Sequence, residues 1–369
     1  MKVLHIISSS GMYGAEAVIL NLSRELRAGL HLSEMGVFSN SANPNHQFHE
    51  YARKEGFESN LIVCSGQIDR AALGRIRELV SDSGADIIHA HGYKADIYSY
   101  LALRGINIPL VSTCHTWYDT DLWVSIYGKI DRFVLRSYTR VVAVSEEVRQ
   151  RLLKAGVRKE KIQLVRNGID LRPFLSQVRD ELEQDLVVGL VGRLAWEKGV
   201  DLFLKAAAKV LVEFPRVRFV VVGDGPDRDQ LERLIDELKI RAKVKMLGRC
   251  EDMAAVYASL DVMVSSSRQE GLPMAILEGM ASGLALVATA VGEVPTVVLD
   301  GRTGLLVPAE NVELLAQGIV TLLQEPARRA QLGAAARQLV KDEYSAERMT
   351  KDYLRVYEEA MEVVRGETK

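Results

Sequence analysis

The chain has 369 residues, of which 48% are hydrophobic and 26% charged, as in an ordinary globular protein. This length is enough for two domains, each with its own core. A formal net charge of only −2 argues against an overall basic surface of the kind that attracts nucleic acid, so we expect no nucleic-acid partner. The three cysteines, Cys64, Cys114 and Cys250, are too few and too scattered for a disulfide framework or a CxxC metal site.

The charge is unevenly distributed along the chain. Residues 1–172 carry 22 Lys/Arg and 18 Asp/Glu, a net of +4, and the rest carries 25 and 31, a net of −6. Either the composition drifts between two domains, or the two halves meet different partners. The apolar run at the N-terminus is too short for a signal peptide, and no stretch has the length of a membrane span. We therefore expect a cytoplasmic protein, at most peripheral at the inner face of the membrane.

Short apolar runs alternate with longer amphipathic ones, which is typical of parallel sheets covered by helices. A first helix is predicted at Ala15–Leu26, where Val18, Leu22 and Leu26 fall on one face. Ser145 is a predicted N-cap, because two acidic residues follow it directly. The strands predicted in the first half are Val3–Ser8, Ile87–His89, Leu110–Ser112 and Arg140–Val144.

A second series of strands and helices begins after Asp185. Its predicted strands are Leu186–Val191, Phe219–Val222, Val262–Ser265 and Leu284–Ala288. Its predicted helices are Asp201–Val212, Met274–Ala281 and a C-terminal group from Val312 to Val364 that breaks near Glu325-Pro326. Between the two series, residues 167–185 hold an Asn-Gly pair, a proline and a run of charges, which indicates a linker.

Loops that follow strands are the candidate sites, because open parallel sheets bind ligands beyond the carboxyl ends of their strands. The segment Ser8–Glu16 holds two glycines and three serines, which suits a phosphate at a helix N-terminus but is equally typical of a tight turn. The segment Gly192–Gly199 holds Arg193 and Lys198. Two cations beside a helix N-terminus suit a diphosphate, although a solvated Glu–Lys pair on a surface loop gives the same pattern.

The segment 268–278 holds two acidic residues, Glu270 in the loop and Glu278 in the helix that follows it. The two carboxylates can accept hydrogen bonds from sugar hydroxyls, one on a ribose and one on a transferred sugar. Gly271 lets the backbone approach a ligand, and Pro273 suits a first helical turn. The alternative is a pair of solvent-facing acids on a surface helix.

Histidines lie at the ends of two predicted strands, with His89 and His91 at the end of one and His115 after another. A His-x-His pair can bind a metal, but no third ligand stands out nearby, so we expect a hydrogen-bonded structural role and no metal. The segment 129–161 holds ten Lys/Arg and four Asp/Glu. It includes the apolar residues Phe133, Val134, Leu135 and Tyr138. This pattern predicts either a basic amphipathic face for anionic lipid or an ordinary covering helix.

Taken together, these loops resemble the family-four retaining glycosyltransferases over nearly the whole chain. The resemblance rests on an ordered set of motifs: Gly11–Glu16, His89-Ala-His91, His115, Val144-Ser-Glu146, Asn167-Gly-Ile-Asp170, Gly192-Arg-Leu, Glu197-Lys-Gly199, Gly223-Asp-Gly-Pro226, and Glu270 with Glu278. It implies an α/β protein with the GT-B fold, in which two Rossmann-like domains face each other across a cleft. The implied domains are an acceptor-side domain at 1–172, a donor domain at 173–345 and a final helix at 346–369 that crosses back to the first domain.

The resemblance also implies roles for individual residues. Arg193 and Lys198 should hold the donor diphosphate, and Glu278 should accept hydrogen bonds from the ribose. Glu270 should hold hydroxyls of the transferred sugar, with backbone contacts from Gly271–Pro273.

In the first domain, Gly14 should let its loop close on the phosphates, and His115 matches the family's active-site histidine. Neither a metal nor a cofactor is implied. Two departures stand out, because the first loop reads Gly-Met-Tyr-Gly where Gly-Gly is commoner, and Thr116 follows the histidine where many relatives have Asp.

The expected reaction moves a sugar from a UDP- or GDP-type donor to a glycan or lipid-linked acceptor with retention of configuration. The leaving diphosphate would be stabilised by Arg193, Lys198 and helix N-termini without a metal. Two alternatives share the architecture. A non-hydrolysing nucleotide-sugar epimerase would act on the donor alone, and a non-catalytic partner subunit would bind it without turnover.

Overall fold

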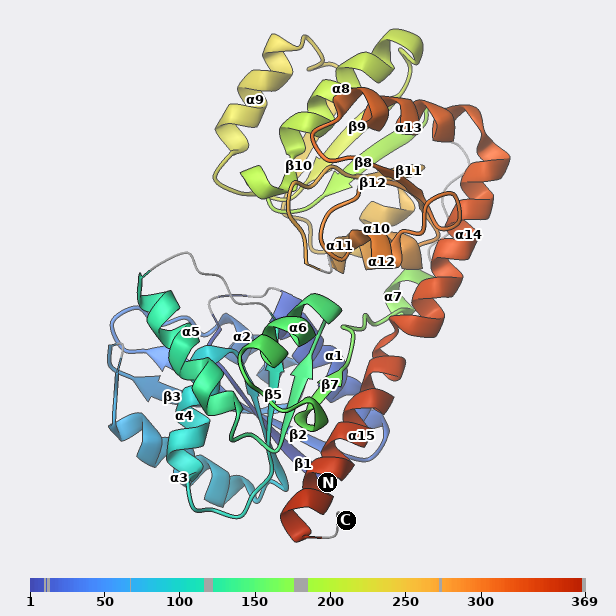
Figure 1. Cartoon of the computed structure of the whole chain (residues 1–369). Coiled ribbons are helices and arrows are strands. Elements are labelled where there is room, and N and C mark those ends of the chain that lie inside the picture. Colours follow the sequence, from blue (N-terminus) through green and yellow to red (C-terminus); the bar gives the residue numbers. More distant parts are fainter. Residues whose placement is uncertain are drawn as a thin grey trace. The chain divides into compact units, whose positions relative to one another are not determined.

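The computed structural model of the chain describes residues 1–9, 11, 14–66, 68–115, 122–175, 185–271 and 274–366, with the backbone alone at 122–126. The chain divides into two compact units (Figure 1). One unit comprises residues 1–168 together with 346–369, and the other comprises residues 169–345. Among the described helices, none combines the length and the apolar character needed to cross a bilayer.

The first unit is built on a parallel sheet whose strand order in the described part of the chain is β3-β2-β1-β4-β5-β6-β7. The strands are β1 (Lys2–Ile7), β2 (Leu32–Asn40), β3 (Glu58–Cys64), β4 (Ile87–His91), β5 (Leu110–Cys114), β6 (Arg140–Ala143) and β7 (Ile162–Leu164). The helices are α1 (Gly14–Ala28), α2 (Gln47–Lys54), α3 (Ala71–Ser83), α4 (Tyr93–Leu103), α5 (Leu122–Leu135), α6 (Glu146–Lys154), the 3₁₀ helix η1 (Lys159–Lys161) and α15 (Ala346–Arg365). The order of the strands reverses between β1 and β4, where doubly wound sheets bind ligands.

Local sequence accounts for these elements. Val18, Leu22 and Leu26 are buried along one side of α1, so the predicted helical face is confirmed. The Ser145 hydroxyl accepts a hydrogen bond from the Val148 backbone N–H at 3.2 Å, which confirms the predicted N-cap. β4 runs two residues further than predicted, since His91 still pairs with Thr113 of β5.

The second unit is built on a parallel sheet with the order β10-β9-β8-β11-β12-β13 in the described part of the chain. The strands are β8 (Val187–Val191), β9 (Arg218–Val222), β10 (Val244–Gly248), β11 (Val262–Ser265), β12 (Ala285–Thr289) and β13 (Leu305–Val307). The helices are α7 (Arg172–Leu175), the 3₁₀ helix η2 (Trp196–Lys198), α8 (Val200–Glu213), α9 (Arg228–Glu237), α10 (Met253–Ala258), α11 (Met274–Ala281), α12 (Val294–Val297), α13 (Val312–Gln324) and α14 (Pro326–Glu343). Here the order reverses between β8 and β11.

Two findings refine the prediction for the second half. Pro326 begins α14, so the predicted break in the C-terminal helices is confirmed. Part of the predicted linker is instead packed into the second unit. Ile169 bridges to Ser345, and Ile169 and Phe174 are buried in a core cluster with α10 and α11.

Candidate functional site

The candidate site lies at the carboxyl edge of the second sheet, where the loops after β8 and β11 adjoin. β8 pairs with β9 on one side and with β11 on the other. The chain winds outward from this point in both directions, so the two loops leave the sheet at its topological switch point. The predicted residues Arg193 and Lys198 lie in the loop after β8, and Glu270 lies in the loop after β11.

Backbone contacts hold these two loops together. The N–H groups of Arg268 and Gln269 both donate to the carbonyl of Glu197, at 2.8 and 3.2 Å. The Ser266 hydroxyl donates to the carbonyl of Gly199 at 2.8 Å. Gly199 has a φ of +60°, and a Cβ at this position would lie 2.1 Å from the Ser266 carbonyl oxygen. Only glycine allows this approach, which sets the loop of Lys198 against the loop of Glu270.

Lys198 and Glu270 form an ion pair in which Nζ lies 2.5 Å from Oε1. The Ser267 hydroxyl donates to the same oxygen at 2.7 Å. The Glu270 side chain is only 8% exposed, whereas that of Lys198 is 25% exposed. The structure therefore brings together two residues that are 72 positions apart, and it fixes the carboxylate by two donors.

Arg193 has a different environment from Lys198. Its side chain is 64% exposed, and Nη1 lies 3.9 Å from Oε1 of Glu197. An ion pair this exposed and this long contributes less than about 1 kcal/mol to stability. The guanidinium can therefore turn toward an anionic ligand at little cost.

Arg268 holds the same loops from within, a role that the sequence analysis missed. Its guanidinium donates to both carboxylate oxygens of Asp201, at 2.7 and 3.0 Å, and to the carbonyl of Trp196 at 3.0 Å. It also pairs with Glu310 and lies 5.3 Å from the centroid of the Trp196 ring. No local signal could have found this role, because these partners come from separate parts of the chain.

Glu278 lies in α11 and accepts a hydrogen bond at Oε2 from the Tyr257 hydroxyl, at 2.8 Å. Burial raises the pKa of Glu278, and the Tyr257 hydroxyl acts in the opposite direction. The carboxylate thus has one fixed partner inside the second unit. Tyr257 is the second residue that the sequence analysis missed.

The other predicted donor-binding positions are less informative. Gly271 is exposed, and a Cβ added there would meet nothing within 4 Å. Leu272 and Pro273 lie outside the described residues. Gly14 is the exposed first residue of α1, and residues 10, 12 and 13 of the loop that precedes it also lie outside them.

His115 directly follows β5 in the first unit. Its ring stacks on that of His91, with centroids 5.9 Å apart and planes inclined by 26°. Burial lowers the pKa of His115 to about 4, so the imidazole is neutral near pH 7. Within the described part of the chain, its Nε2 is buried and has no hydrogen-bond partner.

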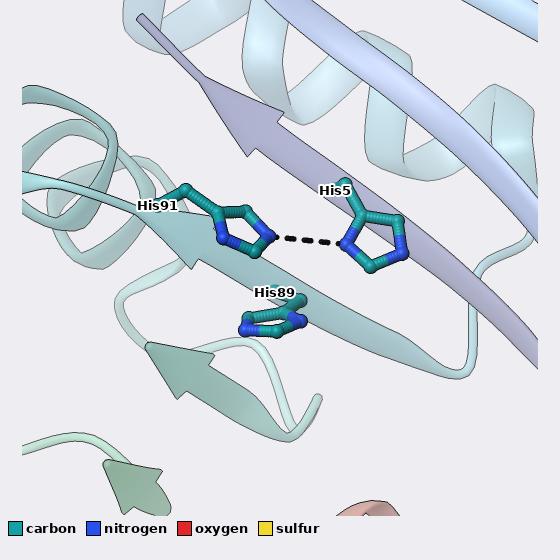
Figure 2. Close-up of side chains that lie close together, drawn as sticks. All are labelled: His5, His89 and His91. Carbon is teal, nitrogen blue, oxygen red and sulfur yellow. Dashed lines mark hydrogen bonds between the residues drawn. The ribbon is translucent and has the colours of Figure 1, made fainter. Parts of the chain in front are cut away.

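A third histidine joins His89 and His91, so the prediction that none lies nearby was wrong (Figure 2). His5 is the register partner of His89 on the adjacent strand β1. Its Nδ1 lies 3.1 Å from Nε2 of His91. The signal was available, because β1 is the usual neighbour of β4 in a doubly wound sheet of this kind.

One nitrogen from each of His5, His89 and His91 lies within 4.8 Å of the others, as metal ligands require. Hydrogen bonds already occupy most of these nitrogens. His5 and His91 bond to each other, and His89 bonds to Tyr357 at 2.8 Å and to Thr113 at 2.7 Å. Burial lowers the pKa of His5 to about 3. The cluster therefore forms a buried network of neutral imidazoles. In the described part of the chain Nε2 of His5 and Nδ1 of His91 have no partner, but both nitrogens of His89 are hydrogen-bonded, so an ion held by all three rings would displace a bond of His89.

The basic segment 129–161 is largely a covering layer of the first unit. Val134, Leu135 and Tyr138 are buried in its core, and Phe133 is 65% exposed. Several of its cations are paired, among them Arg140 with Glu359 at 3.2 Å. Three of the four apolar residues are thus unavailable to a lipid surface, so their burial favours the covering helix over an amphipathic face that includes them.

Comparisons with known proteins show similarity to glycosyltransferases. The model of "Glycosyl transferases group 1" matches residues 172–339, and that of "Glycosyltransferase Family 4" matches residues 12–172. N-acetyl-alpha-D-glucosaminyl L-malate synthase of Bacillus anthracis is 26% identical over 332 residues, which cover 86% of this chain and 85% of the relative. Phosphatidyl-myo-inositol mannosyltransferase of Mycobacterium tuberculosis is 28% identical over 360 residues, which cover 94% and 93%.

Solved structures share the fold over almost the full length. A glycosyltransferase from Rickettsia africae has a TM-score of 0.83 at 21% identity and covers 98% of both chains. Anabaena Alr3699/HepE in complex with UDP has a TM-score of 0.82 at 22% identity, covering 96% of this chain and 99% of that one. The predicted GT-B fold is therefore confirmed.

Proposed function

Because the chain belongs to the family-four glycosyltransferases, we propose that it moves a hexosyl group from a UDP- or GDP-sugar to a glycan or lipid-linked acceptor. We further propose that the reaction retains the anomeric configuration and needs no metal or other cofactor. The observation that carries the proposal is the Lys198–Glu270 pair at the switch point of the second sheet. A cation and an oriented carboxylate side by side suit a ligand that joins a phosphate to a sugar.

The second unit supplies the charges that this reaction requires. When the bond between the anomeric carbon and the phosphate oxygen breaks, its electron pair goes to the diphosphate. Lys198 and the exposed guanidinium of Arg193 stabilise that charge, helped by the N-terminus of α8, which begins directly after Gly199. These groups are already in position before the bond breaks, so little reorganisation of the protein is needed.

The sugar and ribose hydroxyls of the donor are bound by the two carboxylates and the neighbouring backbone. We assign the hydroxyls of the transferred sugar to Glu270 and those of the ribose to Glu278, with backbone contacts from Gly271, Leu272 and Pro273. Glu270 is suited to this task because Ser267 and Lys198 already fix its orientation.

Retention would follow from attack on the same face from which the diphosphate leaves. The acceptor oxygen forms the new bond to the anomeric carbon, and its proton passes to a phosphate oxygen of the leaving group. His115, being neutral, would contribute a hydrogen bond to the sugar rather than a proton. Gly14, at the start of α1, would let the first-unit loop approach the phosphates.

The names of similar proteins indicate which substrates to test first. One solved neighbour holds UDP and another form of it holds UDP-glucose, which favours UDP-sugars. The mycobacterial relative is named for a phosphatidylinositol acceptor, which favours lipid-linked acceptors and peripheral contact with a membrane at the cytoplasmic face. Exposed Phe133 would be the apolar contact in that case.

A donor screen tests the proposal directly. UDP- and GDP-sugars are incubated with the protein, with and without glycan and lipid-linked acceptors, and consumption is followed by mass spectrometry. A transferase consumes one donor and adds its sugar to an acceptor, and NMR of the product gives the anomeric configuration. Interconversion of the donor without an acceptor would indicate an epimerase, and binding without consumption would indicate a non-catalytic subunit.

A further inference from the structure

We propose that Tyr257 is a positioning residue for nucleotide recognition, because it holds the Glu278 carboxylate in the orientation that accepts the ribose hydroxyls. The inference rests on the proposed function, which assigns Glu278 to the ribose. It adds a residue that contacts the carboxylate and not the nucleotide itself.

The geometry makes Tyr257 a rigid donor. It lies in α10 and is fully buried, and its hydroxyl is 2.8 Å from Oε2 of Glu278 in α11. Its ring makes an edge-to-face contact with that of Phe174 in α7, with centroids 5.9 Å apart and planes inclined by 69°. Burial and this ring contact hold the Tyr257 hydroxyl beside the carboxylate. Because Oε2 of Glu278 accepts from Tyr257, we assign Oε1 to the ribose hydroxyls.

The charges of the pair favour the same arrangement. Burial raises the pKa of Tyr257 well above its usual value, so the phenol remains a hydrogen-bond donor at any working pH. Burial also raises the pKa of Glu278, and the hydrogen bond from Tyr257 lowers it. Tyr257 thus helps keep the carboxylate ionised, which is the form that accepts two hydroxyl donors.

Binding of UDP and GDP, and of their 2′,3′-dideoxy counterparts, to the full-length protein measures the effect of Tyr257 on the ribose alone. We expect the parent protein to bind one ribonucleotide at least about tenfold more tightly than its dideoxy form, since each buried hydrogen bond to a charged group contributes about 1.5–3 kcal/mol. Tyr257→Phe should reduce that ratio by about fivefold or more and leave the affinity for the dideoxy form unchanged. The ratio for the variant should also begin to fall at a higher pH, because Glu278 loses a bond that lowers its pKa.

Two further variants separate positioning from a general loosening of the unit. Tyr344→Phe removes a hydroxyl from the same core cluster, where it bonds the Thr296 carbonyl at 3.4 Å, and it should leave the ratio unchanged. In a Glu278→Gln background, adding Tyr257→Phe should have no further effect on the ratio.

The outcomes distinguish this inference from the function on which it rests. If the parent protein prefers a ribonucleotide and Glu278→Gln abolishes the preference, but Tyr257→Phe does not change it, the role of Tyr257 is refuted and the proposed function stands. An effect of Tyr257→Phe that persists in the Glu278→Gln background refutes it as well. If the parent protein binds neither UDP nor GDP, both the donor assignment and this inference fail.

Discussion

Replacing Lys198 with methionine tests the central pair, because methionine keeps an apolar stem and removes the charge. In the native structure Nζ lies 2.5 Å from Oε1 of Glu270, whose side chain is 8% exposed. Loss of a single preorganised donor to the leaving group lowers turnover by about 10²–10³-fold, or roughly 3–4 kcal/mol. We therefore expect kcat to fall by at least about a hundredfold.

The same change should also destabilise the second unit moderately. Breaking a buried ion pair costs about 3–5 kcal/mol, but the Lys198 side chain is 25% exposed and Ser267 still donates to Glu270. We expect a loss of about 1–2 kcal/mol, measured by urea denaturation. The expected loss in turnover corresponds to roughly 3–4 kcal/mol. Since this exceeds the expected loss of folding stability, the kinetic effect cannot come from unfolding.

Lys209→Met is the matched control. Lys209 lies in α8 of the same unit and pairs with Glu313 at 2.9 Å, and both side chains are more than half exposed. This variant should keep its turnover and stay within about 0.5 kcal/mol of the parent stability. Turnover of Lys198→Met within threefold of the parent would refute the assignment of Lys198 to the leaving group.

Four other predictions concern the loops and the histidine cluster. Gly199→Ala should lower stability by about 1–3 kcal/mol and also lower turnover, because its Cβ would lie 2.1 Å from the Ser266 carbonyl oxygen. The control Gly301→Ala has a similar φ of +68° and open space around its Cβ, so it should lower both quantities less. Equal melting temperatures for the two variants would contradict the argument. Arg268→Lys should raise KM for the donor more than it lowers kcat, because lysine cannot bond both oxygens of Asp201; steady-state kinetics that show an unchanged KM would exclude this clamp. The unfolding free energy should fall as the pH drops below about 6.5, because His5 then binds a proton in the unfolded chain but stays neutral in the folded one. The fall should reach up to about 1.4 kcal/mol per pH unit for each such histidine. In denaturation at pH 7.5, 6.5 and 5.5, the unfolding free energy of His5→Gln should fall less steeply than that of the parent. A chelator should change neither turnover nor melting temperature, and a stoichiometric metal found by elemental analysis would show that the histidine cluster holds an ion.

The linear sequence determined part of the secondary structure, because its signals are local, but β2, β3, β7, β10 and β13 were not predicted. Alternating apolar runs placed β8, β9, β11 and β12 within a residue or two. Ser145 marked a helix start and Pro326 a helix break, since capping and the missing N–H of proline act within one turn. The rule that ligands bind at the carboxyl ends of parallel strands also located the loops of Lys198 and Glu270.

Tertiary structure alone decided which of these residues meet. Lys198 and Glu270 are 72 positions apart in the sequence, and they meet because β8 pairs with β11. Tyr257 meets Glu278 only because α10 and α11 pack in one core, and nothing local distinguishes that tyrosine from any other buried one. The same holds for Val134 and Leu135, whose burial under the first sheet removed the apolar face that the sequence suggested. Periodicity specifies which side of an element is apolar, but the partner across the core is set by how the strands are ordered, and that order depends on contacts summed over the whole chain.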